Sequence, residues 1–187
     1  STIIKSPSLG LFDLSCAENS LTHKIYCFGG RQGNQNSNLI YEYDPATDNL
    51  IQKQAVLPYP IRSMSCIENS ANHKIYCFGG YAGNYVAQIF EYNPLTDALV
   101  TKNPIFTYGR EALSCTEDSF THLMYCFGGS TNTNAFTNIF EYNYTADTLS
   151  LRPISLPFPR SGFSCIENSQ THKTYCFGGN NIPLSFH

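Results

Sequence analysis

Eight cysteines carry the most specific chemistry in this sequence of 187 residues. They occur as four pairs, and the two members of each pair are eleven positions apart. Eight cysteines permit more than a hundred pairings in principle, but the recurring spacing favours one pairing inside each copy. The predicted disulfides are Cys16–Cys27, Cys66–Cys77, Cys115–Cys126 and Cys165–Cys176.

We expect the two cysteines of a pair to lie on consecutive antiparallel strands. Facing residues in such strands have Cα atoms about 4.5–5.5 Å apart, which suits a disulfide. Eight buried free thiols are the alternative, and a zinc site is disfavoured because no Cys-x-x-Cys spacing occurs. Disulfides at this density indicate an oxidising compartment, so we predict a secreted, extracellular protein. A glycosylation sequon at Asn143 agrees with that route.

A glutamate and a histidine also recur between the members of each cysteine pair. They are Glu18 and His23, Glu68 and His73, Glu117 and His122, and Glu167 and His172. Such groups are suited to acid–base catalysis or to metal binding. A catalytic site needs one asymmetric constellation, however, whereas fourfold copying indicates turns whose polar side chains bond to nearby backbone. We therefore predict that the protein is not an enzyme and has no catalytic residue, metal site or cofactor.

The composition limits the classes of partner. The net charge of -3 and the pI near 5.9 provide no basic surface for nucleic acid. No apolar run approaches the ~18 residues that a membrane-spanning helix needs. Tyr and Phe number 13 each, while glycine, proline and asparagine are frequent. Aromatic residues favour strands and the latter residues favour turns, so the composition predicts an all-β fold.

The elements that must position the cysteines come from a repeat. The pattern Tyr-Cys-Phe-Gly-Gly begins at Tyr26 and returns after 50, 49 and 50 residues, which indicates a repeat architecture. We treat residues 1–187 as one domain with repeats at 1–50, 51–100, 101–149 and 150–187.

Each repeat predicts four short strands. In the second repeat they fall near residues 63–67, 74–78, 87–92 and 98–102, separated by polar turns and by the glycine pair. The second and third strands carry apolar groups on both faces, which is typical of sheets that are covered on both sides. Four short antiparallel strands per repeat describe the blade of a β-propeller.

The glycine pair and a later Glu-Tyr-Asp/Asn-Pro-x-Thr-Asp segment make the chain resemble the Kelch-repeat family. The segment occurs at residues 42–48 and 91–97. Kelch repeats usually carry a tryptophan on the fourth strand, whereas this chain has none and places Leu50, Leu99 and Leu149 near that position. The resemblance implies a Kelch-like β-propeller of about four blades, each of four short antiparallel strands, with one blade incomplete.

The incomplete blade is the last one, since its repeat stops after the second strand. Residues 2–5 match a fourth-strand segment, so the first hypothesis is that they fold back and close a four-bladed ring. The second hypothesis is that a strand of another chain, or more of the same chain, completes the blade, because an unpaired edge is a template for strand addition. That hypothesis predicts a homo-oligomer or filament joined through the terminal strands.

Because successive strands of a blade run in opposite directions, the loops between them alternate between two rims of the fold. The loops between the first and second strands are nearly constant, whereas those between the second and third strands differ in every copy, and ligands usually bind at such variable loops. The predicted ligand-binding residues are Arg31, Asn34, Tyr59, Arg62, Tyr81, Tyr85, Tyr108, Arg110, Asn132, Phe136, Phe158 and Arg160.

The arginines before the first strands resemble those at the mouth of the central channel in Kelch domains. They could bind a carboxylate or a sulfate, pair with Asp13 or Glu111, or face water. The resulting prediction is a secreted, non-catalytic binding scaffold with a protein or glycan partner. The alternatives are a structural subunit of an extracellular filament or coat, and a lectin.

Overall fold

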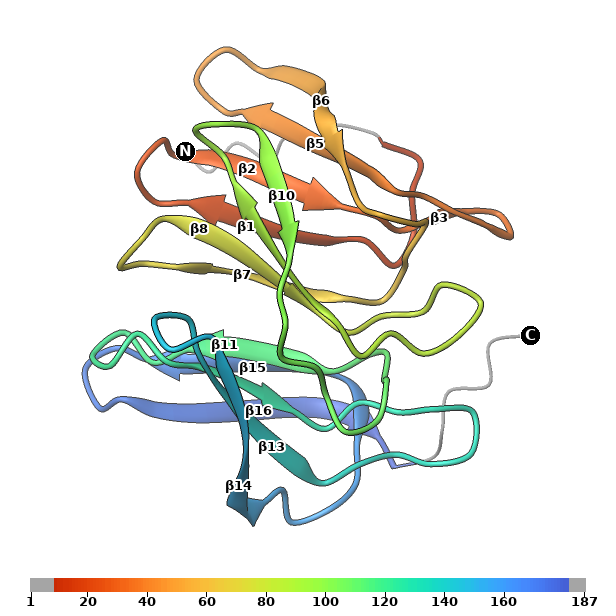
Figure 1. Cartoon of the computed structure of the whole chain (residues 1–187), viewed down its shortest axis with the longest axis vertical. Helices are drawn as coiled ribbons and strands as arrows, with labels where there is room; N and C mark the ends of the chain where they lie inside the picture. Colours follow the sequence, from red (N-terminus) through yellow and green to blue (C-terminus); the bar gives the residue numbers. More distant parts are fainter. Residues whose placement is uncertain (1–8, 182–187) are drawn as a thin grey trace.

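The computed structural model describes residues 9–181, which form an all-β chain (Figure 1). Three four-stranded antiparallel sheets follow one another along the sequence, and a two-stranded sheet comes last. The first sheet consists of β1 (Ser15–Asn19), β2 (Lys24–Phe28), β5 (Leu39–Asp44) and β6 (Asn49–Val56). The second consists of β7 (Ser65–Asn69), β8 (Lys74–Phe78), β9 (Ile89–Asn93) and β10 (Ala98–Thr101). The third consists of β11 (Ser114–Glu117), β12 (Met124–Phe127), β13 (Asn138–Asn143) and β14 (Thr148–Ser155).

The last sheet pairs only β15 (Ser161–Asn168) with β16 (Lys173–Asn180). A small hairpin of β3 (Arg31–Gln32) and β4 (Gln35–Asn36) extends the loop between β2 and β5. Strand order inside each large sheet follows chain order, as predicted for a blade. The predicted strand at residues 2–5 lies outside the described residues, so ring closure through it stays a prediction.

Turn chemistry explains why the strands stop where they do. The four turn histidines have φ between 52° and 57°, and the N–H of His73, for example, donates to the carbonyl of Asn69. Asp48, Asp97 and Asp147 adopt the same left-handed conformation before the fourth strands, where Asp tolerates positive φ better than most residues. Residues with positive φ and local backbone bonds therefore close these hairpin turns.

The two faces of each sheet have different roles. One face carries the tyrosine and phenylalanine of the second strand and is called here the aromatic face, and the other carries the disulfide and is called the cysteine face. In the first interface Tyr26 and Phe28 pack against Cys66 and Cys77, and all four are buried. Tyr92 belongs to the same buried cluster. The second interface repeats this arrangement with Tyr76 and Phe78.

The first strands of successive sheets lie side by side, β1 next to β7, β7 next to β11 and β11 next to β15. The N–H of Ser63 donates to the carbonyl of Asp13, that of Ala112 to Ser63, and that of Gly162 to Ala112. These four equivalent residues line one pocket of about 200 Å³. Among residues 9–181, no backbone bond of this kind joins Gly162 back to Asp13.

The aromatic face of the last sheet is open. Ile166, Tyr175 and Phe177 are 63%, 47% and 66% exposed, whereas the equivalent Tyr76 and Phe78 are 1% and 0% exposed. Within residues 9–181, the last sheet therefore lacks the covering neighbour that each earlier sheet has on this face. In the described range, no helix is long and apolar enough to span a membrane.

Candidate functional site

All four predicted disulfides are present. The paired cysteines face each other in the antiparallel register, with Cα–Cα distances of 4.0–4.1 Å, and none of the described cysteines is free. Cys66 and Cys77 are 5% and 1% exposed, whereas Cys16, on the cysteine face of the first sheet, is exposed. Four disulfides indicate an oxidising environment.

The constant turns join neighbouring sheets. The carboxylate of Glu68 accepts bonds from the backbone N–H and the hydroxyl of Ser20 in the preceding repeat. Glu117 accepts from Ser70, and Glu167 from Ser119, in the same way. The recurring glutamates and histidines are thus turn residues, as predicted, and they also hold the sheets together.

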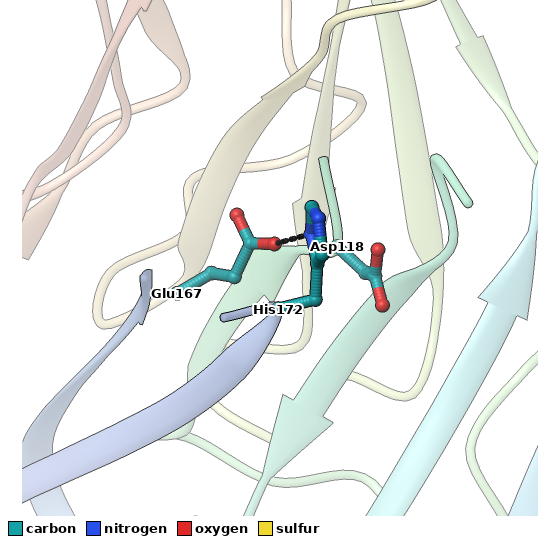
Figure 2. A group of neighbouring side chains, drawn as sticks. All are labelled: Asp118, Glu167 and His172. Carbon is teal, nitrogen blue, oxygen red and sulfur yellow. Dashed lines mark hydrogen bonds and ion pairs between the residues drawn. The ribbon is translucent and has the colours of Figure 1, made fainter. Parts of the chain in front are cut away.

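Asp118, Glu167 and His172 form the group that most resembles a metal site (Figure 2). Their candidate ligand atoms lie within 4.8 Å of one another, and Nδ1 of His172 is 3.0 Å from Oε1 of Glu167. Asp118 also accepts from the N–H groups of Phe120 and Thr121. Burial raises the pKa of Asp118, but these backbone bonds outweigh it and leave the pKa below its ordinary value.

The same positions explain this group without a metal. Glu117 and His122 form the same contact at 3.3 Å one repeat earlier, and Asn69 stands where the third repeat has Asp118. Burial raises the pKa of Glu117, opposed by bonds from Ser70 and His122. The cluster is therefore one copy of a recurring turn, and we assign it no catalytic or metal-binding role.

The variable rim contains a second group of polar side chains, around a pocket of about 460 Å³. We call it the rim pocket, and its lining is Arg31, Asn34, Asn36, Pro60, Arg62, Tyr81, Ala82 and Gly83. The pocket lies where the β3–β4 hairpin meets the loop after β8, which leave the sheets on the same side (Figure 1). The side-chain amide of Asn36 donates a 3.0 Å bond to the carbonyl of Tyr81 and ties the two loops together.

Charges in the rim pocket are balanced by neighbouring carboxylates. Nε of Arg31 donates a 2.7 Å bond to Asp13, and Arg62 lies 4.0 Å from Asp13 and 3.9 Å from Glu111. Burial raises the pKa of Glu111, and the charge of Arg62 opposes that rise. Pairing with Asp13 or Glu111 was one of the alternatives for the arginines before the first strands, and Arg62 lies beside both carboxylates.

Aromatic rings extend the rim pocket outward. The guanidinium of Arg62 lies 4.9 Å from the ring centre of Tyr81, and the rings of Tyr81 and Tyr85 are 5.3 Å apart, edge to face. The hydroxyl of Tyr85 donates to the side chain of Asn132 in the next repeat. Flat rings beside amides and guanidinium groups provide both apolar area and hydrogen-bond donors for a polar ligand.

Residues 19–49 and 69–98 each match the Kelch motif. This chain contains Kelch repeats. Each matched stretch runs from the end of a first strand to the start of a fourth strand, so it includes the glycine pair and the turn after the third strand. Comparison with curated proteins found no match.

The Kelch repeats place the remaining predicted ligand residues in different surroundings. Tyr108 and Phe158 are 66% and 64% exposed. Tyr59 is half-buried, with its ring against Phe90 and its hydroxyl bonded to Gln88. Arg160 donates a 3.1 Å bond to the carbonyl of Gly178. Asn143 caps the turn after β13 through its side-chain oxygen, and its glycosylation stays a prediction.

The placement of Arg110 on the exposed rim was wrong. This side chain is 1% exposed and its guanidinium packs 4.4 Å from the ring centre of Phe136 and 4.8 Å from that of Phe140. Burial lowers the pKa of Arg110 to about 10. The sequence alignment explains the error in part, because Arg110 and Arg160 stand five positions before their cysteines, whereas Arg62 stands four before Cys66.

Sequence reasoning also missed contributors to the rim pocket. Asn36 and Asp13 were not among the predicted ligand residues, although Asp13 was considered as an arginine partner. Asn36 belongs to a loop whose length and hairpin differ from the other copies, and no repeat comparison could place its amide against Tyr81. The sequence signal that pointed toward Asn36 was the predicted ligand residue Asn34 in the same loop.

Proposed function

We propose that this Kelch-repeat chain is a non-catalytic binding scaffold of the extracellular space, and that the rim pocket binds a protein partner. Kelch-repeat domains are generally binding scaffolds. The observation that carries the proposal is the convergence of Arg31, Arg62 and Tyr81 from two repeats on one open pocket. Arg and Tyr are the side chains that dominate many protein interfaces.

The two rims differ in structural role, and this difference supports the proposal. The constant turns are occupied with inter-sheet bonds such as Ser20 to Glu68, so they have a structural use. The loops of the variable rim differ in each repeat, and two of them surround the rim pocket. Variation at this rim alters binding without loss of the fold.

The non-catalytic part of the proposal rests on the repetition of the acid–histidine pairs. A general base and its orienting group form a functional unit at one place. Here the pairs recur in all four repeats, with Nδ1–Oε1 distances of 3.0–3.4 Å. Their use in turns accounts for that recurrence.

The test compares rim variants in capture experiments with extracellular proteins of the source organism. We expect Tyr81→Ala and Asn34→Ala to abolish capture of a defined protein that the unaltered chain retains. Leu21→Ser is the matched control, because Leu21 is 53% exposed but lies on a constant turn. Capture that is equal for all variants would contradict a role for the rim pocket.

A glycan array with the same proteins distinguishes the two classes of partner. Under our proposal no glycan is retained through Tyr81 or Asn34. Specific glycan binding that is lost in both rim variants would instead support the lectin alternative.

The second candidate function is a structural subunit of an extracellular filament or coat. The observation that favours it is the two-stranded last sheet, which has an unpaired edge along β16 in the described structure. Electron microscopy of the purified chain at rising concentration tests it. Ordered polymers would support this candidate, and a monodisperse particle at all concentrations would refute it.

A further inference from the structure

Glu111 is a buried carboxylate at the variable rim, three residues before β11. Its side chain is 3% exposed, and its Oε2 atom accepts no hydrogen bond from residues 9–181. Within that range its ion-pair partner is Arg62, whose Nη2 lies 3.9 Å from Oε2, which is longer than a hydrogen bond. A buried carboxylate without a direct bond to a cation costs free energy as long as it is ionised.

Glu42 shows how the same chain stabilises a buried carboxylate elsewhere. Its side chain is 7% exposed, Nζ of Lys53 donates a 2.8 Å bond to Oε2, and Lys24 donates to Oε1. Burial raises the pKa of Glu42, but the bonds and charges of the two lysines outweigh it and leave the pKa below its ordinary value. At Glu111 burial also raises the pKa, and the charge of Arg62 opposes this rise without cancelling it.

The other charged and titratable groups that act on Glu111 come from three segments. Asp13, before β1, lies 4.0 Å from Arg62, and its charge raises the pKa of Glu111 further. Arg31 of β3 bonds to Asp13 at 2.7 Å and acts on Glu111 in the opposite direction. Burial first, and then the charge of Glu111, raise the pKa of Tyr85 in the loop after β8, so this phenol stays uncharged where carboxyl groups titrate.

The carboxylate belongs to the third repeat alone. The residues four positions before the first cysteine of each pair are Phe12, Arg62, Glu111 and Ser161. Glu111 faces Ser130 across a short backbone bridge, and the buried hydroxyl of Ser130 has no hydrogen-bond partner within residues 9–181, so it does not stabilise the carboxylate. A residue that the fold itself required would recur, as the glycine pairs do.

We propose that Glu111 is a proton-operated switch of the rim pocket, and that protonation of its carboxylate releases Arg62 and gives the pocket a net positive charge. The inference rests on the binding function proposed above for this pocket. With Glu111 ionised, Asp13 and Glu111 balance Arg31 and Arg62, and with Glu111 protonated one positive charge is left. Both arginines line the pocket, so an anionic group of a partner should bind more tightly in mildly acidic surroundings.

The direction of the pH dependence follows from the burial of Glu111. Its ordinary pKa is 4.5, and its pKa in the fold lies above that value. The stability that the protonated group contributes is therefore complete below pH 4.5 and is lost as the pH rises through the pKa of the folded protein. Glu111→Gln, which cannot ionise, should unfold at a higher temperature than the unaltered chain at neutral pH.

The first test is the titration of the Glu111 side-chain carboxyl carbon by nuclear magnetic resonance. It uses the unaltered whole chain, with the signal assigned through its bonds to the backbone, and it needs no ligand. We expect a midpoint above 4.5. A midpoint at or below 4.5 would overturn the proposal.

The second test uses inorganic sulfate as a probe of the charge in the pocket, because sulfate keeps its double negative charge over this pH range. The side-chain amide signals of Asn34 and Asn36, which line the pocket, report its binding. For the unaltered chain the affinity should rise about threefold or more between neutral pH and about pH 5 at low salt. Glu111→Gln should reach the higher affinity already at neutral pH and change little with pH.

Glu117→Gln is the matched control. Burial raises the pKa of Glu117 as well, but this residue lies at a constant turn, where it accepts a bond from Ser70. Its replacement should leave sulfate binding and the pH dependence of that binding as in the unaltered chain. Circular dichroism and the mass of the four-disulfide form establish that both variants are folded, and the carboxyl titration decides the question if Glu111→Gln does not fold.

Three results with sulfate would each contradict the switch. They are affinity that does not rise on acidification, equal affinity of Glu111→Gln and the unaltered chain at neutral pH, and an equal gain in Glu117→Gln. Neither test uses a partner protein, so the two proposals can fail separately. Capture that is lost in Tyr81→Ala, together with an ordinary Glu111 titration, would leave the binding function without the switch, and a raised midpoint without any capture would do the reverse.

Discussion

The side-chain amide of Asn69 donates a 2.8 Å hydrogen bond to the backbone carbonyl of His122 in the next sheet. Asn19 donates an equivalent 2.7 Å bond to His73. Both asparagines are buried, at 0% and 1% exposure. The bond connects the turn of one repeat to the turn of the next, so these asparagines stabilise the stacking of the sheets as well as their own turns.

Replacing Asn69 by aspartate should destabilise the fold by about 1–3 kcal/mol, because the buried donor is lost and a carboxylate faces a carbonyl oxygen. Asn168→Asp is the matched control. Asn168 is exposed and uses only its side-chain oxygen, which accepts from Gln170 and Thr171, so aspartate should be nearly neutral there. Chemical denaturation of both variants measures the difference, and equal losses would contradict the inter-sheet role.

The glycine pairs offer a second comparison. A Cβ on Gly79 would lie 2.6 Å from the carbonyl oxygen of Arg110 in the next sheet, whereas a Cβ on Gly178 would meet nothing within 4 Å. Both glycines have positive φ, of 65° and 75°, so alanine is strained at either position by about 1–2 kcal/mol.

Gly79→Ala should therefore cost about 1–3 kcal/mol more than Gly178→Ala, because only the former forces the two sheets apart. Thermal unfolding of the two variants tests this. If the two alanine variants have equal unfolding temperatures, the close approach of Gly79 to Arg110 does not contribute to stability.

Reduction should open the disulfides in an order that follows their burial. Cys16 is exposed, whereas Cys66 and Cys77 are 5% and 1% exposed. We expect a mild thiol reductant to open Cys16–Cys27 first and Cys66–Cys77 later, because attack requires access to a sulfur. Alkylation followed by peptide mass spectrometry reports the order, and simultaneous opening would indicate global unfolding instead.

Tyr125 should make stability fall at alkaline pH. Burial first, and then the hydroxyl bond to Glu141, raise the pKa of Tyr125 to about 12 from the ordinary value of 10.0. The protonated hydroxyl is favoured in the fold, so its stabilising contribution is complete below pH 10.0 and is lost as the pH rises toward about 12.

The measurement is the free energy of unfolding between neutral pH and about pH 11. Tyr125→Phe removes the titrating group, so its stability should decline less steeply than that of the unaltered chain. An unchanged slope would show that Tyr125 does not contribute to the alkaline transition.

Much of the fold was predictable because its signals are local. The eleven-residue spacing of Cys66 and Cys77 predicted the register of β7 and β8, and the structure pairs these two residues directly. Leu99 and Leu149, which stand where a Kelch tryptophan is usual, pack against the cores as partly buried residues. Both features depend on neighbours along one or two strands.

The candidate site was less predictable because its residues come from different repeats. The sequence favoured Arg31, Arg62 and Tyr81 as members of one rim, yet the tie between Asn36 and Tyr81 depends on how two loops of unequal length meet. Arg110 was misplaced for a different reason, since the rings of Phe136 and Phe140 in its own repeat cover it only after the third sheet has folded.

By itself the sequence determined the repeat, the four disulfides, the strand order within a blade and the oxidising environment, because each depends on residues close together in the chain. Only the tertiary structure decided that the constant turns join the sheets and that Arg110 is buried. The first property arises from bonds between residues about fifty positions apart and the second from the rings of Phe136 and Phe140 in the folded third sheet, and no local pattern of side chains specifies these contacts.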